Sequence, residues 1–195
     1  MHSAIFPLQT VLFPAARMKL QIFEPRYVQM MKDCMQQSCG FVVSYLDAGE
    51  EVLKPGQTAI FRDVACLASI VDWQRLDNGL LGIEIEGQSV VSIDQHDQLD
   101  NGLHVGEITP RSESDHVSLP EEGRELVEWL QNLTMRQNPE MACDWSCANQ
   151  VSYRLAQVMP LTQLQKQLLL EIEDPLHRLS QIQQLLLTAE HSFNA

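Results

Sequence analysis

Basic side chains are scarce in this sequence. Its 195 residues include 13 Lys and Arg against 26 Asp and Glu, a formal net charge of −13, and no run of Lys or Arg offsets this excess locally. Such a chain repels the phosphates of nucleic acids and the headgroups of anionic membranes. We therefore expect neither a nucleic acid nor a membrane as its partner.

Long apolar runs are missing as well. No stretch approaches the roughly 18 apolar residues that a membrane-spanning helix requires, and the N-terminus lacks the basic segment and apolar run of a signal peptide. The cysteines are odd in number and scattered, unlike a disulfide framework; they are Cys34, Cys39, Cys66, Cys143 and Cys147. Reduced thiols in a cytoplasmic protein account for them most simply.

Recognisable catalytic motifs are also absent. The sequence has no Gly-x-x-x-x-Gly-Lys-Ser/Thr loop for nucleotide phosphates and no Gly-x-Ser-x-Gly elbow. Cys143 and Cys147 would share one helix face, but a metal needs about four ligands and no histidine lies near them in sequence. We expect no catalytic residue, no cofactor and no metal. An enzyme such as a small-molecule hydrolase stays open as an alternative, because residues such as His96, His104 and His116 can meet a nucleophile in space.

The first half of the chain has the two-residue period of strands. Apolar residues alternate with polar ones, for example at Met18, Leu20 and Ile22. Asp77-Asn78-Gly79 predicts a hairpin turn between strands at 65–73 and 80–86, because Asn and Gly tolerate a positive φ. Many short strands favour an antiparallel sheet or a small barrel; further strands are expected at 41–46, 58–64, 89–94 and 103–108.

One helix is expected inside this half. Pro25 suits its first position, where the missing N–H does no harm. The apolar residues that follow have helical spacing: Tyr27, Met30, Met31 and Cys34. Gly40 is expected to end this helix, because glycine readily adopts the left-handed conformation found there.

The second half has the period of helices. Ser118-x-x-Glu121 and Thr162-x-x-Gln165 have the spacing of capping boxes. Asn138-Pro139 would end the first helix, a second would run over 147–159, and Asp174-Pro175 would begin the last. The period changes within the polar stretch 111–115. We therefore predict an α+β chain: a β-rich subdomain at 1–112, built as a twisted antiparallel sheet or pseudo-barrel with one helix, then a helical bundle at 113–195.

Three segments of the sequence carry a distinctive set of motifs. The first comprises Ile5-Phe6-Pro7-Leu8, Val11-Leu12-Phe13-Pro14 and Leu20-Gln21-Ile22-Phe23-Glu24-Pro25-Arg26-Tyr27. The second is Gly56-Gln57-Thr58-Ala59-Ile60, followed by Asn78-Gly79 and by a turn at Glu86-Gly87. The third comprises Met159-Pro160-Leu161, Lys166-Gln167, Leu169-Leu170-Glu171, Asp174, Arg178-Leu179 and Leu185-Leu186.

These three segments resemble the LON domain family, and the resemblance implies a PUA-like β-rich subdomain followed by a helical bundle. It also implies substrate recognition, because in Lon proteases this region precedes the ATPase and helps to capture unfolded or degron-bearing substrates, with no agreed catalytic residues of its own. Since no ATPase loop and no second domain for a Ser–Lys dyad are found, the chain resembles a stand-alone, non-catalytic member. Its expected partners are unfolded or extended polypeptides together with a protease or chaperone, and it is expected to be a monomer or a weak homo-oligomer.

Seven residues are candidates for a peptide-binding groove. Phe6, Pro7 and Phe23 offer apolar edges that suit an extended peptide. Glu24, Pro25, Arg26 and Tyr27 combine two charges and a ring where a helix begins and its N–H groups are unsatisfied. The structural alternative is core packing of the rings, edge protection by proline, and a cap and an ion pair for Glu24 and Arg26. RNA binding by analogy with PUA-like folds is a further alternative, which the acidic charge opposes.

Overall fold

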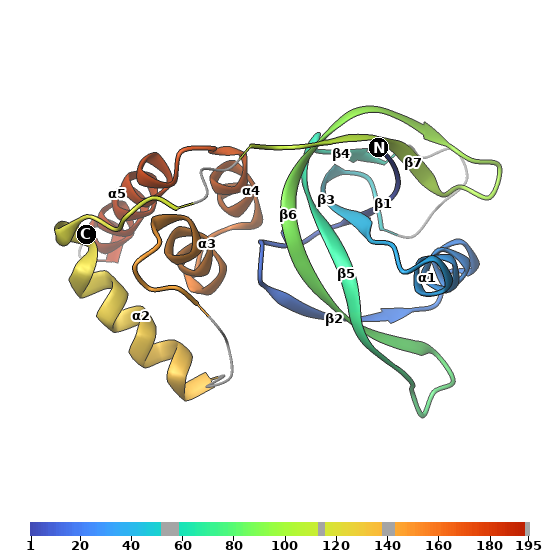
Figure 1. Ribbon diagram of the computed structural model, residues 1–195, viewed down its shortest axis with the longest axis horizontal. Helices are drawn as coiled ribbons and strands as arrows, with labels where there is room; N and C mark the ends of the chain where they lie inside the picture. Colours follow the sequence, from blue (N-terminus) through green and yellow to red (C-terminus); the bar gives the residue numbers. More distant parts are fainter. Residues whose placement is uncertain (52–58, 113–115, 138–142, 194–195) are drawn as a thin grey trace. The chain divides into compact units, whose positions relative to one another are not determined.

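The computed structural model describes residues 1–51, 59–112, 116–137 and 143–193. The chain divides into two compact units, Met1–Arg111 and Ser112–Ala195 (Figure 1). Unit 1 contains β1 (His2–Leu8), β2 (Arg17–Ile22), α1 (Pro25–Gln37), β3 (Phe41–Ala48), β4 (Ile60–Phe61), β5 (Val64–Arg75), β6 (Leu81–Gln98) and β7 (His104–Pro110). Unit 2 contains the short 3₁₀ helix η1 (Glu121–Gly123), α2 (Arg124–Gln137), α3 (Ala148–Val158), α4 (Gln163–Glu171) and α5 (Pro175–Phe193). The predicted order of a strand-rich part with one helix and then a helical part is confirmed.

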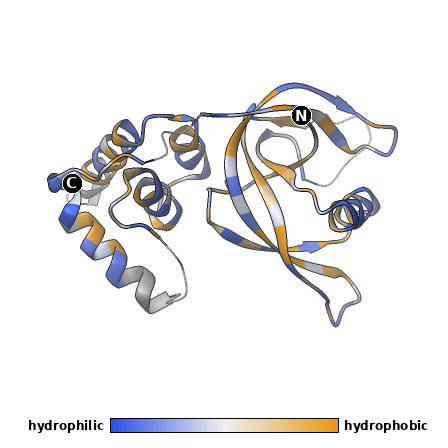
Figure 2. Cartoon of the chain, in the orientation of Figure 1, coloured by the Kyte–Doolittle hydropathy of each residue, from blue (hydrophilic) through white to orange (hydrophobic). Residues whose placement is uncertain are grey.

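The sheet of unit 1 closes on itself. β1 pairs with β7, β7 with β6, β6 with β5 and β5 with β3, all antiparallel, and β3 returns to β1 in parallel. The interior is filled by apolar side chains from these strands, as the alternation of inward and outward residues requires: Ile5, Val42, Phe61, Ala65, Val91, Ile93 and Ile108. In Figure 2 much of β5 is apolar, whereas the helices of unit 2 alternate between apolar and polar patches.

A three-stranded arm extends from this closed sheet. The first part of β6 carries β2 on one side and the second part of β5 on the other, and the turn at Asp77-Asn78-Gly79 joins β5 to β6. Gly79 has a φ of 82°, and Leu76 N donates to Leu80 O at 2.9 Å, so the predicted hairpin is confirmed. We refer to residues 69–86 together with β2 as the β5–β6 arm.

The turn predicted at Glu86-Gly87 is wrong, because β6 runs through these residues as one strand. Gly87 is needed for close approach instead: a Cβ there would overlap the Phe13 carbonyl oxygen and lie 2.9 Å from Cys66 Sγ. The segment before β2 crosses the strand at this point, where Ala15 N donates to Gly87 O at 2.8 Å. The predicted strand at 58–64 also differs: β4 and the start of β5 divide it, and Thr58 lies outside the described residues.

Helix α1 begins as predicted, with Pro25 in its first turn and the Glu24 carbonyl accepting from Tyr27 N and Val28 N at 3.0 Å each. Its predicted end at Gly40 is wrong, because the left-handed residue is Ser38, with a φ of 51°. Gly40 serves a different purpose. A Cβ on it would lie 2.5 Å from Ala68 O, so glycine lets the chain pass close to β5 as it enters β3.

In unit 2 the capping box at Thr162 and Gln165 is confirmed, with Gln165 N donating to Thr162 Oγ1 at 3.2 Å. Asp174 caps α5 through a 3.0 Å bond from Leu176 N. The capping box predicted at Ser118 is wrong, because Ser118 forms a β-bridge with Cys147 and η1 begins after Pro120. The predicted end of the first helix at Asn138-Pro139 lies outside the described residues.

A buried arginine joins three helices of unit 2. Arg178 of α5 is fully buried, and its guanidinium donates to Asn149 Oδ1 at 3.0 Å and to Ser152 Oγ at 2.8 Å, both on α3. It also lies 3.8 Å from the centre of the Tyr153 ring and donates to the Leu169 carbonyl of α4 at 3.1 Å. A buried cation requires such partners, because leaving it unpaired is costly.

Candidate functional site

Arg26 lies at the centre of the seven residues that the sequence marks as a candidate site. It is buried, and its guanidinium donates to Glu24 Oε2 at 3.1 Å, to the Gly102 carbonyl at 2.6 Å and to the Glu51 carbonyl at 3.2 Å. The guanidinium also stacks 4.3 Å from the centre of the Tyr27 ring. These contacts join the start of α1 to two loops, which is a structural role.

Three further candidates face the core. Phe6 and Tyr27 are buried and their ring centres lie 4.1 Å apart, while Pro7 is buried within β1 opposite Ser44 of β3. Burial raises the pKa of Tyr27 to about 12. Because these side chains are covered, the groove that the sequence suggested around them does not reach the surface at Phe6, Pro7 and Tyr27.

Two candidates remain on the surface. Phe23 is 55% exposed, and Pro25 is exposed at the start of α1. Phe23 directly follows Ile22, which pairs with Leu81 near the tip of the β5–β6 arm. The structure therefore places the accessible part of the predicted site beside this arm.

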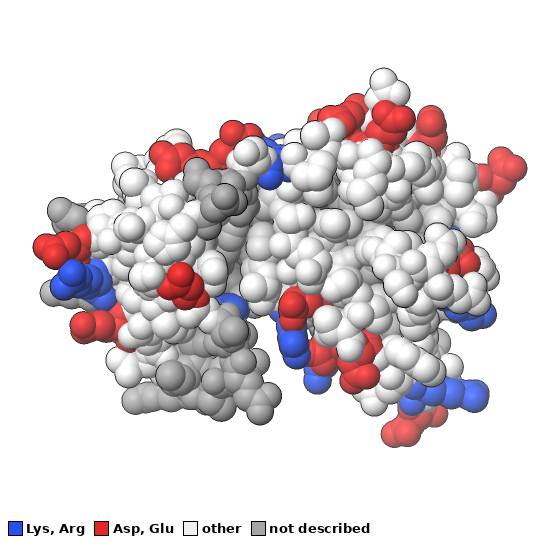
Figure 3. Space-filling view, in the orientation of Figure 1, with Lys and Arg blue, Asp and Glu red and all other residues white. Residues whose placement is uncertain are grey.

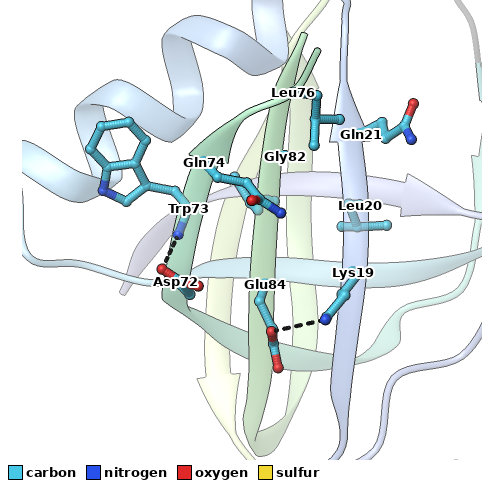
Figure 4. A pocket seen from close by; sticks show the side chains of 10 residues that line it. Lys19, Leu20, Gln21, Asp72, Trp73, Gln74, Leu76, Gly82 and Glu84 are labelled. Atoms are coloured by element: carbon cyan, nitrogen blue, oxygen red, sulfur yellow. Dashed lines mark hydrogen bonds and ion pairs between the residues drawn. The ribbon is translucent and has the colours of Figure 1, made fainter. Parts of the chain in front are cut away.

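One side of the arm holds an open polar cavity of about 230 Å³ (Figure 4). The charged residues at its margin are Lys19, Asp72 and Glu84, and Lys19 Nζ lies 3.8 Å from Glu84 Oε2. Gly82 lets the Leu76 side chain pack close to β6 at this cavity, because a Cβ at Gly82 would lie 2.9 Å from Leu76 Cδ2. The cavity offers carboxylates and amides for hydrogen bonds, with four apolar side chains beside them: Leu20, Trp73, Leu76 and Ile83.

The other side of β5 borders a second and larger hollow of about 600 Å³, between that strand and the C-terminal half of α1. Its lining mixes polar residues with residues that are apolar or carry a thiol; the apolar and thiol side chains are Cys34, Met35, Cys39, Ile70, Val71 and Trp73. Trp73 is 60% exposed and Val71 is 42% exposed, so large apolar side chains meet solvent here. Grouped apolar exposure of this kind is typical of a binding surface.

Sequence reasoning missed Trp73 and its neighbours. A signal was present, because Ile70, Val71 and Trp73 interrupt the strict alternation of apolar and polar residues in this strand. Such an interruption marks a β-bulge or a strand without cover on one face, and the pairing of β5 with β6 does shift between Ile70 and Asp72.

Among the described side chains, the structure places the histidines and cysteines as follows. His104 is buried against Phe61, with ring centres 5.2 Å apart; burial chiefly, and then His96 and Arg26, lower the pKa of His104. Cys147 caps α3 and Cys143 precedes the helix, so the prediction that they share a helix face is wrong. In the part of the chain that the structure describes, no group of three or more His, Cys, Asp or Glu residues could hold a metal ion.

Charge and helix length bear on the partner as well. On the face shown in Figure 3, the described Lys and Arg side chains form no continuous basic patch, and acidic side chains are spread over the surface. No helix in the described ranges is both long and apolar enough to cross a membrane.

A closed, mainly antiparallel sheet with one helix, followed by a helical unit, defines an α+β protein. The chain belongs to the family of the ATP-dependent protease La (LON) substrate-binding domain, whose model matches residues 3–188. Among solved structures it is similar to a Lon N-terminal domain protein from Xanthomonas campestris, with 26% identity and a TM-score of 0.76 over 93% of this chain and 96% of that one. It shares the fold of the N-terminal domain of Mycobacterium avium complex Lon protease, at 14% identity and a TM-score of 0.65 over 93% and 96% of the two chains. No curated protein matches it significantly.

Proposed function

We propose that this domain binds unfolded or degron-bearing polypeptides without cutting them, and that the β5–β6 arm with Phe23 is the surface that holds them. The observation that carries this proposal is the exposure of Trp73 and Val71 beside a hollow of about 600 Å³. An unfolded chain differs from a folded one in offering apolar side chains and unpaired backbone, and both suit this surface.

The family supports the same reading, since its members are described as substrate-binding domains. A protease or chaperone would receive the captured chain, and the domain would act in the cytoplasm as a monomer or a weak homo-oligomer. The five free thiols agree with a reducing compartment. The net charge of −13 favours solubility and partners with basic residues, and it disfavours RNA.

Binding can be tested with a single protein in two states. Reduced, carboxymethylated α-lactalbumin stays unfolded, whereas the same protein with intact disulfides is folded. We expect the domain to bind the first and not the second in isothermal titration calorimetry. Equal binding to both, or to neither, would contradict the proposed function.

The surface can be tested separately. Trp73→Ala removes the most exposed apolar side chain of the arm, and Trp129→Ala removes an indole that is 47% exposed on α2 of unit 2. We expect about a tenfold loss of affinity for the first variant, as for an aromatic residue central to an interface, and no change for the second. The reverse order would place the binding surface on unit 2.

A further inference from the structure

Strand β5 has an edge that its neighbour leaves open. β3 pairs with β5 only from Phe41 opposite Ala68 to Val43 opposite Cys66. Beyond Ala68, residues 69–75 pair with β6 along one edge of β5. Along the opposite edge, which β3 would cover, no strand among the described residues pairs with them. An uncovered strand edge presents backbone N–H and C=O groups that another extended chain can use.

β3 begins at Phe41, so its pairing with β5 does not extend beyond Ala68. Just before Phe41, the backbone at Gly40 lies so close to β5 that a Cβ on Gly40 would be 2.5 Å from Ala68 O. On the N-terminal side of Phe41 the chain leads back to the end of α1, which forms the second wall of the hollow of about 600 Å³ beside residues 69–73. The space between is bounded by a strand edge on one side and a helix on the other. We call this space the β5–α1 groove.

The pairing register of β5 with β6 shows which side chains face the β5–α1 groove. Ile70 pairs with Ile85 and Trp73 with Ile83, and one extra residue lies between Ile70 and Asp72. Ile70 and Trp73 therefore point to the same side of the sheet as the two buried isoleucines. With Met35 of α1 they give the groove an apolar wall.

The charge of the groove is negative. Helix α1 has no basic residue in its last turn, so the partial negative charge of its C-terminus is not offset by a side chain there. Asp72 is the charged residue in the lining of the groove, and it is exposed. A chain that carries Lys or Arg complements both features.

We propose that the β5–α1 groove takes one extended segment of a polypeptide as an added strand, antiparallel to residues 69–75 of β5 and in line with β3. This rests on the proposed function and specifies its substrate: a segment with alternating β-branched or aromatic residues and a Lys or Arg placed to meet Asp72. Backbone hydrogen bonds give affinity in this mode, and alternate side chains give specificity.

The empty edge is protected from pairing with a second copy. Trp73 N donates to Asp72 Oδ1 at 2.8 Å, on the side of β5 away from β6 (Figure 4). The bulge between Ile70 and Asp72 also disturbs the regular ladder that edge-to-edge pairing needs. An incoming strand with a basic side chain draws the Asp72 carboxylate away and frees the Trp73 N–H.

The probe is the peptide acetyl-TVTVKVTVT-amide, in which alternating valines flank a central lysine that meets Asp72. We expect it to bind the intact chain, and we expect hydrogen exchange to slow at the amides of residues 69–75 when it binds. The same peptide with N-methyl groups on its central residues keeps its side chains but loses backbone donors, and we expect at least about a tenfold loss of affinity. Equal affinity of both peptides, or protection at amides elsewhere, overturns strand addition.

Variants test the charge. Asp72→Lys should weaken binding of this peptide about tenfold and favour a version with Glu in place of the central lysine, since an opposite charge pair becomes a like one. Asp97→Lys makes the same charge change at an exposed position of β6 and should leave the affinity unchanged. If both variants behave alike, Asp72 does not select the basic residue and the proposed specificity is wrong.

These outcomes are separable from the proposed function. If unfolded α-lactalbumin binds but residues 69–75 stay unprotected, polypeptide binding stands and strand addition fails. If neither unfolded protein nor peptide binds, the proposed function itself fails. Concentration-dependent protection of residues 69–75 without any peptide would instead assign the edge to a second copy of this chain and overturn the proposal.

Discussion

Replacing Arg178 should destabilise unit 2 more than any exposed substitution. The guanidinium donates to the side chains of Asn149, Ser152 and Tyr153 and to the carbonyls of Leu169, Ile172 and Glu173. Arg178→Ala leaves a cavity and strands these acceptors inside the protein, at about 1–3 kcal/mol for each group that water does not reach. Because such losses are not additive, we expect about 3–5 kcal/mol in total, as for removing one partner of a buried charged network.

The assay is urea unfolding combined with hydrogen exchange of amides in α3 and α5, which reports unit 2 by itself. A loss of this size lowers the urea midpoint by more than about 1 M. Arg178→Lys should recover only part of it, because an ammonium cannot reproduce the planar fork of donors. Arg124→Ala is the control: its side chain is 70% exposed and pairs with Glu121 at 2.9 Å, so we expect less than about 0.5 kcal/mol. Should Arg178→Ala cost no more than Arg124→Ala, the network is not what holds these helices together.

Three further predictions concern stability. Gly87→Ala should lower the free energy of unfolding by about 1–3 kcal/mol or more, because its Cβ would overpack against the Phe13 carbonyl. Gly123→Ala is the control and should be nearly neutral in thermal unfolding, because its Cβ would lie no closer than 3.6 Å to Leu119. Equal effects of the two substitutions would refute the close approach at Gly87. Burial lowers the pKa of His104 in the folded state, so the unfolded chain binds more protons and stability should fall as the pH drops through about 6.5. His104→Gln should flatten this dependence of Tm on pH, and an unchanged slope would assign it to other groups. Thr162→Ala should cost about 1 kcal/mol by removing the cap of α4, while a Tm equal to wild type would show that the capping box contributes nothing.

Much of the fold could be predicted because its signals are local. The alternation at Met18, Leu20 and Ile22 marks β2, Pro25 marks the start of α1, and Thr162 with Gln165 marks the start of α4. Each of these signals depends on residues within a few positions of one another. The capping box predicted at Ser118 failed because its backbone pairs with Cys147, a residue far along the chain.

The candidate site was less predictable for the same reason. The motif from Phe23 to Tyr27 stands out in the sequence, but its most distinctive residue, Arg26, bonds to the carbonyls of Gly102 and Glu51 and supports the fold. The exposed surface at Trp73 has no comparable motif. Whether a strand residue is covered depends on where the neighbouring strand stops, which the local sequence does not contain.

By itself the sequence determined the period of each segment, the starts of α1 and α4, the hairpin at Gly79 and the acidic charge, because these follow from the residues at and beside each position. Only the tertiary structure decided that another part of the backbone lies close to Gly87 and to Gly40, and that Arg178 is buried and bonded to several helices. It also decided that β5 has an open edge beside α1. The physical reason is that burial and steric contact arise between residues far apart in the chain. Phe13 meets Gly87, and Asn149 meets Arg178, only after the strands and helices have packed.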